Sequence, residues 1–127
     1  MAQQTILVVE DEYGSAEVLQ LVLEIEGYRV LLASNGREAL DLMAQHRPDL
    51  VLTDFMMPIM SGAQLGAALR ERPATSPIAI VMMSAAEESV VRRQFRDYNA
   101  FLRKPFSVEA LLPVVRKLVS TPRLTGT

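Results

Sequence analysis

Short apolar runs alternate along this chain with segments of helical periodicity, and this alternation constrains the fold more than any other feature. Five runs have the length and apolar character of buried strands: Thr5–Val9, Arg29–Ala33, Leu50–Thr53, Ile78–Met83 and Ala100–Arg103. Short continuous runs of this kind are typical of strands that are covered on both faces, as in parallel sheets. The sequence therefore favours a parallel sheet.

Apolar residues at helical spacing follow each run. They lie around Val18–Leu23 and Ala39–Met43, and over about Gly62–Arg70, Glu87–Phe95 and Ser107–Val119. Five strands alternating with five helices predict an α/β fold with a doubly wound parallel sheet, right-handed crossovers and helices on both faces. Gly27 stands where a glycine commonly ends a helix, and Asn35 with Glu38 predicts a capped helix start. Pro113 predicts a kink or restart of the last helix near residues 109–113.

Polar residues that could carry chemistry stand where these strands end. Glu10 and Asp11 follow the first strand, Asp54 follows the third, Ser84 the fourth and Lys104 the fifth. In open parallel sheets, ligands bind beyond the carboxyl ends of the strands. We therefore expect these side chains, although far apart in sequence, to converge at one edge of the sheet.

Three carboxylates at one edge require a raised pKa or a bound cation. Two unit charges about 4 Å apart repel by roughly 4 kcal/mol at an effective dielectric constant of about 20. Oxygen ligands of this kind are those that Mg²⁺ prefers. A lysine and a serine hydroxyl beside them suit the oxygens of a phosphoryl group. Asp54, alone at a strand end before a loop, is the best candidate for a carboxylate nucleophile that forms an aspartyl phosphate.

Four segments carry these residues, with the sequences ILVVEDE at 6–12, TDFMMPIMSG at 53–62, MMSA at 82–85 and FLRKPF at 101–106. In this order and spacing, the chain resembles the receiver domain of two-component response regulators over about residues 5–119. The resemblance implies a flavodoxin-like sheet with the strand order 2-1-3-4-5. It also implies that Asp54 accepts a phosphoryl group from a phosphohistidine, on a sensor histidine kinase or a histidine phosphotransfer protein, in a Mg²⁺-dependent reaction.

Roles for the acidic residues follow from the same resemblance. Glu10 and Asp11 would belong to the metal pocket with Asp54, and Asp11 would be the more direct Mg²⁺ ligand. The backbone carbonyl of Met56, two residues past Asp54, would give the metal a further ligand. The chain would be a signalling switch rather than an enzyme, catalysing only its own phosphotransfer and a slow autodephosphorylation.

The switch is also defined by the resemblance. Ser84 and Lys104 would contact the phosphoryl oxygens, and Phe101, three residues before the lysine, would be the aromatic switch residue. Movement of Ser84 and Phe101 would then alter the surface of the fourth helix, fifth strand and fifth helix. A cis peptide bond between Lys104 and Pro105 is implied as well.

Some positions depart from the commonest pattern of the family. The first acid is Glu10 rather than aspartate, and Asp97 stands seven residues before Lys104, where glycine is usual. If the backbone there has a positive φ, aspartate tolerates it better than most residues do. Neither Met56 nor Ala86, each two residues beyond a site residue, can orient an attacking water with its side chain. We therefore expect the aspartyl phosphate to hydrolyse slowly.

Simpler interpretations exist for single residues. Glu10–Glu12 could be acids that favour a helix N-terminus, Ser84 with Glu87 fits a capping box, and Phe101 could be a core residue. His46 is expected at a helix C-terminus without a catalytic role. The simultaneous presence of suitable chemistry at four strand ends argues against these interpretations as the whole explanation.

Two other functions remain open at this point. The chain could be an inactive receiver that only binds partners, although the acidic residues, Asp54, Ser84 and Lys104 are all present. It could also be a phosphohydrolase with an aspartyl-phosphate intermediate, but such enzymes use a second acid two residues after the nucleophile, where this chain has Met56.

A cationic surface is expected over the fourth helix, fifth strand and fifth helix. It is either a solvated face or a docking site for an acidic downstream protein, an output domain or a second copy of the chain. Its basic residues are Arg92, Arg93, Arg96, Arg103, Arg116 and Lys117.

Composition excludes several classes of function. The 127 residues contain no cysteine and one histidine, which removes thiolate chemistry and multi-histidine metal sites and places the phosphodonor on another protein. A net charge of −2 argues against direct nucleic-acid binding, and the apolar runs are too short for a membrane span. We expect a cytoplasmic protein with a receiver domain over residues 1–120. Residues 121–127 would be a polar tail or the start of a truncated linker, so the chain is a stand-alone receiver or the receiver of a longer regulator.

Overall fold

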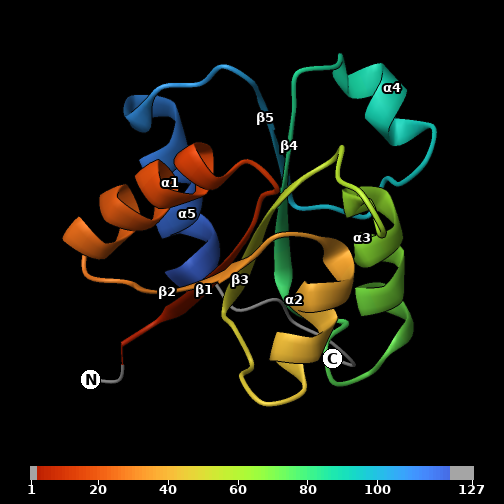
Figure 1. The fold of residues 1–127 in the computed structure, drawn as a ribbon, viewed down its shortest axis with the longest axis horizontal. Helices are drawn as coiled ribbons and strands as arrows, with labels where there is room; N and C mark the ends of the chain where they lie inside the picture. The colour runs from red at the N-terminus through yellow and green to blue at the C-terminus, as the bar shows by residue number, and fades with distance from the viewer. Residues whose placement is uncertain (1–2, 121–127) are drawn as a thin grey trace.

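A five-stranded parallel sheet forms the centre of the molecule in the computed structural model, which describes residues 3–120 (Figure 1). Its strand order is β2-β1-β3-β4-β5, as predicted. The strands are β1 (Thr5–Val9), β2 (Arg29–Ala33), β3 (Leu50–Asp54), β4 (Ala79–Ser84) and β5 (Ala100–Arg103). The predicted tail, residues 121–127, lies outside the described residues.

Helices cover both faces of the sheet (Figure 1). They are α1 (Tyr13–Ile25), α2 (Gly36–Met43), α3 (Gly62–Glu71), α4 (Glu88–Arg92) and α5 (Val108–Ser120). Leu23 of α1 and Val115 of α5 pack on one face, whereas Ala39, Leu65 and Val91 of the other three helices pack on the opposite face. None of the described helices is long and apolar enough to cross a membrane.

Successive residues of each central strand point into different cores. Ile6 and Val8 of β1 belong to the core beneath α1 and α5, while Leu7 and Val9 belong to the core beneath α2, α3 and α4. All four side chains are fully buried. This two-sided burial explains why the strands appear in the sequence as continuous apolar runs without alternation.

The predicted helix ends at Gly27 and Asn35 are confirmed. Gly27 has a φ of +97° and directly follows Glu26, the C-cap of α1. The Asn35 side chain accepts a hydrogen bond from the backbone N–H of Glu38 at 2.9 Å, and the Glu38 carboxylate in turn accepts from the backbone N–H of Ser34. These contacts satisfy N–H groups that a helix start would otherwise leave unpaired.

Two helix predictions are wrong in part. The fourth helix was expected over Glu87–Phe95 but is regular only over Glu88–Arg92, because Val91 is its one buried residue and Phe95 packs against Gly66 of α3 instead. The last helix runs as one element through Pro113, so it does not restart near residues 109–113.

Candidate functional site at the strand ends

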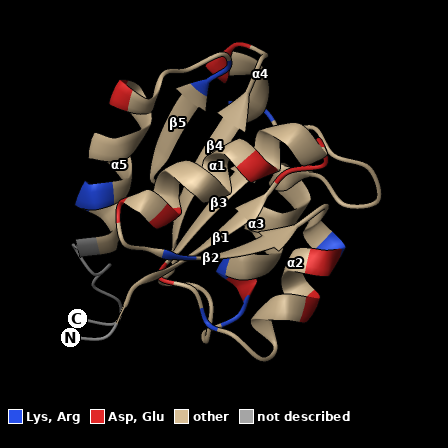
Figure 2. Cartoon of the chain, turned by 60° about the vertical axis from the view of Figure 1, so that its left-hand side comes forward, with Lys and Arg blue, Asp and Glu red and all other residues tan. Residues whose placement is uncertain are grey.

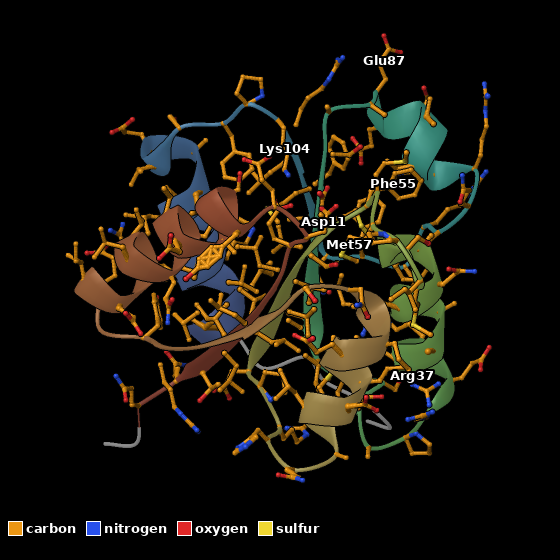
Figure 3. The ribbon with its side chains drawn as sticks, viewed as in Figure 1. Asp11, Arg37, Phe55, Met57, Glu87 and Lys104 are labelled. Carbon is orange, nitrogen blue, oxygen red and sulfur yellow. The ribbon has the colours of Figure 1, made fainter. Side chains whose placement is uncertain are left out.

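The carboxyl ends of β1, β3, β4 and β5 bring the predicted site residues to one edge of the sheet. Asp54 and Ser84 are the last residues of β3 and β4, and Glu10 and Lys104 directly follow β1 and β5. The backbone N–H of Lys104 donates to the Ser84 carbonyl at 2.8 Å, which continues the pairing of the two strands. Figure 3 shows Asp11 and Lys104 at this same end.

Three carboxylates form a compact acidic pocket there. Glu10, Asp11 and Asp54 each offer an oxygen, and these oxygens all lie within 4.8 Å of one another. Glu10 is 3% exposed and Asp54 is 8% exposed, whereas Asp11 is open to solvent. Oxygen donors at this spacing, one of them accessible, match the ligand preference of a hard divalent cation such as Mg²⁺.

Lys104 ties two of these carboxylates together. Its Nζ lies 2.6 Å from Glu10 Oε1 and 3.2 Å from Asp54 Oδ2. Burial lowers the pKa of Lys104, but the hydrogen bond to Glu10 and the charge of Asp54 outweigh that effect and hold the pKa above its ordinary value. The ammonium is therefore a fixed positive charge, yet one ammonium cannot neutralise three carboxylates, and the pocket keeps a net negative charge.

Ser84 does not cap the following helix, so the predicted capping box with Glu87 is wrong. The Ser84 Oγ accepts a hydrogen bond from the backbone N–H of Ala86 at 3.0 Å. The N-cap of α4 is Glu87 itself, and it makes no side-chain capping bond. Ser84 is the last residue of β4 and is 1% exposed, so it stays at the edge of the sheet beside the strand that carries Asp54.

The end of the loop between β3 and α3 lies close against the backbone of Asp54. The backbone N–H of Gly62 donates to the Phe55 carbonyl at 2.9 Å, and a Cβ at Gly62 would lie 2.2 Å from the Asp54 carbonyl oxygen. Only glycine permits this close approach. Met56, the predicted site residue in the same loop, is 70% exposed. Glycine at 62 therefore fixes the start of α3 against the backbone of Asp54.

Aromatic side chains connect the predicted switch residue to α4. Phe101 is half-buried, and its ring lies 6.2 Å from that of Tyr98, which lies 6.3 Å from Phe95. The Tyr98 hydroxyl donates to the carboxylate of Glu88, the first residue of α4. Burial raises the pKa of Tyr98, and the hydrogen bond and charge of Glu88 raise it further. Sequence reasoning missed Tyr98, because a lone tyrosine before a strand carries no distinctive signal.

Asp97 does not have the positive φ considered for it. Among the described residues, the non-glycine residue with a positive φ is Ile59, at +68°. The Asp97 carbonyl accepts a hydrogen bond from Arg70 Nε at 2.9 Å, and the same guanidinium donates to Asn99 Oδ1 at 3.0 Å. Arg70 of α3 thus holds the segment that leads into β5.

The expected cationic surface is divided. Arg116 Nη2 lies 2.7 Å from Glu26 Oε1, so this residue of α5 faces α1 rather than α4. Arg103 donates from Nε to the Ala85 carbonyl at 3.2 Å. The basic residues at the end of β5 and on α5 lie well apart in Figure 2. Exposed Arg92, Arg93 and Arg96 remain together on and after α4.

A cavity of about 770 Å³ opens beside the pocket, between the start of α1 and the turn that follows β5. Glu10 and Lys104 are among its polar lining residues, and Val18 and Phe106 are among its apolar ones. The peptide bond between Lys104 and Pro105 in that turn is cis, as predicted. The site is therefore approachable from this side by a group larger than a single ion.

Two proteins of Bacillus subtilis are similar in sequence to this chain. YkoG of Bacillus subtilis, an uncharacterized transcriptional regulatory protein, is 38% identical over 116 residues, which cover 91% of this chain and 51% of YkoG. The sporulation initiation phosphotransferase F of the same species is 33% identical over 119 residues, covering 92% of this chain and 94% of that protein. The chain thus spans about half the length of YkoG.

Solved structures share the fold. The receiver domain of a signal transduction histidine kinase from Syntrophus aciditrophicus superposes with a TM-score of 0.88 at 32% identity, covering 98% of this chain and 96% of that one. The receiver domain of a sensor histidine kinase from Pseudomonas aeruginosa, with a magnesium ion in its active-site cleft, gives 0.87 at 26%, covering 94% and 100%. The sequence model of the response regulator receiver domain matches residues 6–116, and the chain belongs to that family of two-component signalling domains.

Proposed function

We propose that this chain is a phosphoacceptor switch in which Asp54 accepts a phosphoryl group from the phosphohistidine of a sensor histidine kinase or histidine phosphotransfer protein. The observation that carries the proposal is the position of Lys104 Nζ, 2.6 Å from Glu10 and 3.2 Å from Asp54 within a cluster of three carboxylates. A fixed positive charge beside a carboxylate nucleophile suits the transfer of a phosphoryl group, whose oxygens carry negative charge.

The acidic pocket fits a divalent cation by its donor set. Glu10, Asp11 and Asp54 would hold Mg²⁺, together with the backbone carbonyl of Met56. A bound Mg²⁺ would neutralise negative charge on the pocket and on the incoming phosphoryl oxygens. The magnesium ion in the related Pseudomonas aeruginosa receiver supports this assignment.

The residues of the chain have distinct tasks in the transfer. A carboxylate oxygen of Asp54 forms a bond to phosphorus as the bond from phosphorus to the donor imidazole nitrogen breaks. The nitrogen keeps the electron pair, which leaves the donor histidine unphosphorylated. The ammonium of Lys104 and the hydroxyl of Ser84 would contact the phosphoryl oxygens, and the carboxylates of Glu10 and Asp11 would hold the metal.

Phosphorylation would then change a surface at some distance from Asp54. The Ser84 hydroxyl turns towards the phosphoryl group, and Phe101 moves inward into the space that this vacates. Because Tyr98 links Phe101 to Glu88 at the start of α4, the change reaches the α4-β5-α5 face. That face would bind a downstream protein, an output domain or a second copy of the chain, with Arg92, Arg93 and Arg96 as its basic residues.

Two further features belong to the proposal. Met56 and Ala86 have no polar side-chain atom that could orient a water, so the aspartyl phosphate hydrolyses slowly for a protein of this kind. The protein works in the cytoplasm, which is supported by the name of YkoG as a transcriptional regulatory protein, since bacterial transcription takes place there.

The test is covalent labelling with a small phosphodonor. Wild-type chain incubated with acetyl phosphate and Mg²⁺ is expected to gain the mass of one phosphoryl group, and Asp54→Asn is expected to gain none. Chelation of Mg²⁺ should prevent labelling of the wild type. A wild-type chain that stays unlabelled, or an Asp54→Asn variant that is labelled equally, would contradict the proposal and favour a receiver that only binds partners.

A further inference from the structure

The segment that joins Ser84 to the middle of α4 has no buried residue of its own. The residues from Ala85 to Val90 are exposed or half-buried, whereas Ser84 before them and Val91 after them are buried. Segments with few buried apolar contacts open locally at low free energy. The position of residues 85–90 therefore depends on hydrogen bonds to neighbouring elements.

Arg103 and Lys104, at and just after the end of β5, bind consecutive carbonyls at the end of β4. Arg103 lies opposite Ser84 in the parallel pair of these two strands, which run side by side in Figure 1. The backbone N–H of Lys104 donates to the Ser84 carbonyl at 2.8 Å, and Nε of Arg103 donates to the Ala85 carbonyl at 3.2 Å. The Arg103 side chain thus extends the pairing of the two strands by one carbonyl.

The peptide group that Arg103 holds is the one that contacts the Ser84 hydroxyl. The Ala85 carbonyl and the Ala86 N–H belong to one planar trans peptide group, so they point in opposite directions. The carbonyl accepts from Arg103, and the N–H donates to Ser84 Oγ at 3.0 Å. A rotation of this group would break both hydrogen bonds together. Arg103 therefore acts on the Ser84 hydroxyl through the backbone.

We infer that Arg103 is a positioning residue for Ser84, which holds the hydroxyl in its unphosphorylated orientation and opposes its turn towards a phosphoryl group on Asp54. The inference rests on the proposed function, in which the hydroxyl makes that turn. When Ser84 Oγ turns, it leaves the Ala86 N–H that Arg103 holds in place. A restraint present in one of two states favours that state and weakens any ligand that binds the other. Release of the restraint consequently strengthens the binding of a phosphoryl mimic.

Arg103 can be changed without releasing α4. The Tyr98 hydroxyl still binds the Glu88 carboxylate, and Val91 stays fully buried, so the helix keeps its own anchors. Arg103 and Ala85 are both exposed, so water can replace the lost donor. Loss of a positive charge would by itself weaken the binding of an anion. The restraint and the charge therefore predict effects of opposite sign.

The test is the affinity of Arg103→Met for beryllofluoride, which with Mg²⁺ takes the place of a phosphoryl group on an aspartate. Methionine keeps an aliphatic side chain and removes the guanidinium. The Kd, measured by NMR titration at saturating Mg²⁺, should fall about fivefold relative to wild type, as expected for the release of one hydrogen bond. In the free variant, the Ala86 amide should exchange with solvent about fivefold faster, while Gln94 and Phe95, which donate to the Val91 carbonyl, should exchange as in wild type.

Two further variants separate the restraint from other effects. Arg37→Met removes a positive charge from the pair with Asp41 on α2 and should leave the Kd within about 1.5-fold of wild type. In a chain that already carries Ser84→Ala, the hydroxyl is absent, so Arg103→Met should have no further effect on the Kd.

Four results would overturn the inference. These are a Kd for Arg103→Met that is unchanged or higher, an equal gain in Arg37→Met, an equal gain in the Ser84→Ala background, and an unchanged exchange rate at Ala86. Each leaves the proposed function standing if wild type binds beryllofluoride. A wild-type chain that does not bind beryllofluoride in the presence of Mg²⁺ would overturn the proposed function, and this inference with it.

Discussion

The two helices that follow the central strands of the site are held in place very differently. α3 follows β3, has ten residues, begins with a capping box between Ser61 and Gln64, and buries five residues. α4 follows β4, has five residues, lacks a side-chain cap and buries Val91. Most helical stability in proteins comes from packing of an apolar face, and regions with few buried contacts open locally at low free energy. The side of the site that carries Asp54 is therefore rigid, and the side that follows Ser84 is the one able to rearrange.

α4 is nevertheless attached at its far end. The ring of Phe95 lies against Gly66 of α3, where a Cβ would come within 2.5 Å of it, and Arg70 of α3 holds the carbonyl of Asp97. Between these anchors and Ser84, the hydroxyl of Tyr98 fixes Glu88. The comparison thus becomes one between a helix fixed along its length and a helix held at its two ends.

A substitution at the start of α3, on the rigid side of the site, should lower the free energy of unfolding most. Gly62→Ala places a Cβ 2.2 Å from the Asp54 carbonyl oxygen, a backbone atom that cannot move away without displacing β3. We expect a loss of about 3 kcal/mol in the free energy of unfolding, measured with urea, and slower labelling by acetyl phosphate. Gly14→Ala is the matched control, because nothing lies within 4 Å of its Cβ. It should leave stability unchanged or raise it by up to about 1 kcal/mol.

Loosening the connections that Arg70 makes from α3 to the segments before β4 and β5 should have the next largest effect on stability. Arg70 Nη1 donates to the carbonyls of Ser76 and Ile78 at 2.8 and 2.7 Å, and its side chain is 9% exposed. Arg70→Met keeps the aliphatic bulk but leaves these carbonyls without that donor, and should lower the free energy of unfolding by about 2–3 kcal/mol.

Arg37→Met is the control for this charge removal. The pair between Arg37 and Asp41 spans 3.8 Å with both side chains at least 70% exposed, and Figure 3 shows Arg37 away from the site. Its loss should change stability by less than about 0.5 kcal/mol. Equal effects of the two variants in urea unfolding would show that the segments before β4 and β5 are not anchored through Arg70.

Removing the Tyr98 hydroxyl should act locally and more weakly. Tyr98→Phe keeps the ring contacts with Phe95 and Phe101 but removes the hydrogen bond to Glu88. A single hydrogen bond contributes about 1 kcal/mol, so amide exchange over residues 88–92 should become about fivefold faster. Exchange in α3 should stay as in the wild type. Uniform acceleration in both helices would contradict the contrast between them.

The smallest expected effect is a difference in Tm between the wild type and Tyr98→Phe at alkaline pH. Burial and Glu88 raise the pKa of Tyr98 above its ordinary value of 10.0, so folding favours the protonated hydroxyl. Its contribution to stability is complete below about pH 10 and is lost as the pH rises through the raised pKa. Lys104, whose pKa is also raised, titrates in the same range in both proteins. The Tm of the wild type should therefore fall more steeply above pH 10 than that of Tyr98→Phe.

The strands and the position of the site were predictable because each depends on local pattern. Buried parallel strands need continuous apolar runs, and the carboxyl ends of such strands meet wherever the sheet forms. Asp54, Ser84 and Lys104 could therefore be placed together from their positions after such runs. Their convergence needed only the topology, which is shared by all sheets of this kind.

The features that were missed depend on contacts between distant residues. Ser84 and Glu87 match a capping box by spacing, but pairing with β5 keeps Ser84 in β4, and its hydroxyl meets the N–H of Ala86 instead. The end of α4 is set by the packing of Phe95 on Gly66, which no local pattern reveals. Ile59 has a positive φ in a loop whose next residue, Met60, accepts a hydrogen bond from Gly36 at the start of α2, and glycine would have been the residue to expect at position 59.

The ion pairs of Lys104 have a consequence for the synthesis of the protein. This residue lies 94 positions after Glu10 and 50 positions after Asp54, so the pocket joins the ends of β1, β3 and β5, which are far apart in the sequence. A nascent chain that has made β1 and β3 but not β5 holds its carboxylates without their ammonium. Under the proposed function, competence for phosphotransfer therefore requires that β5 has paired with β4.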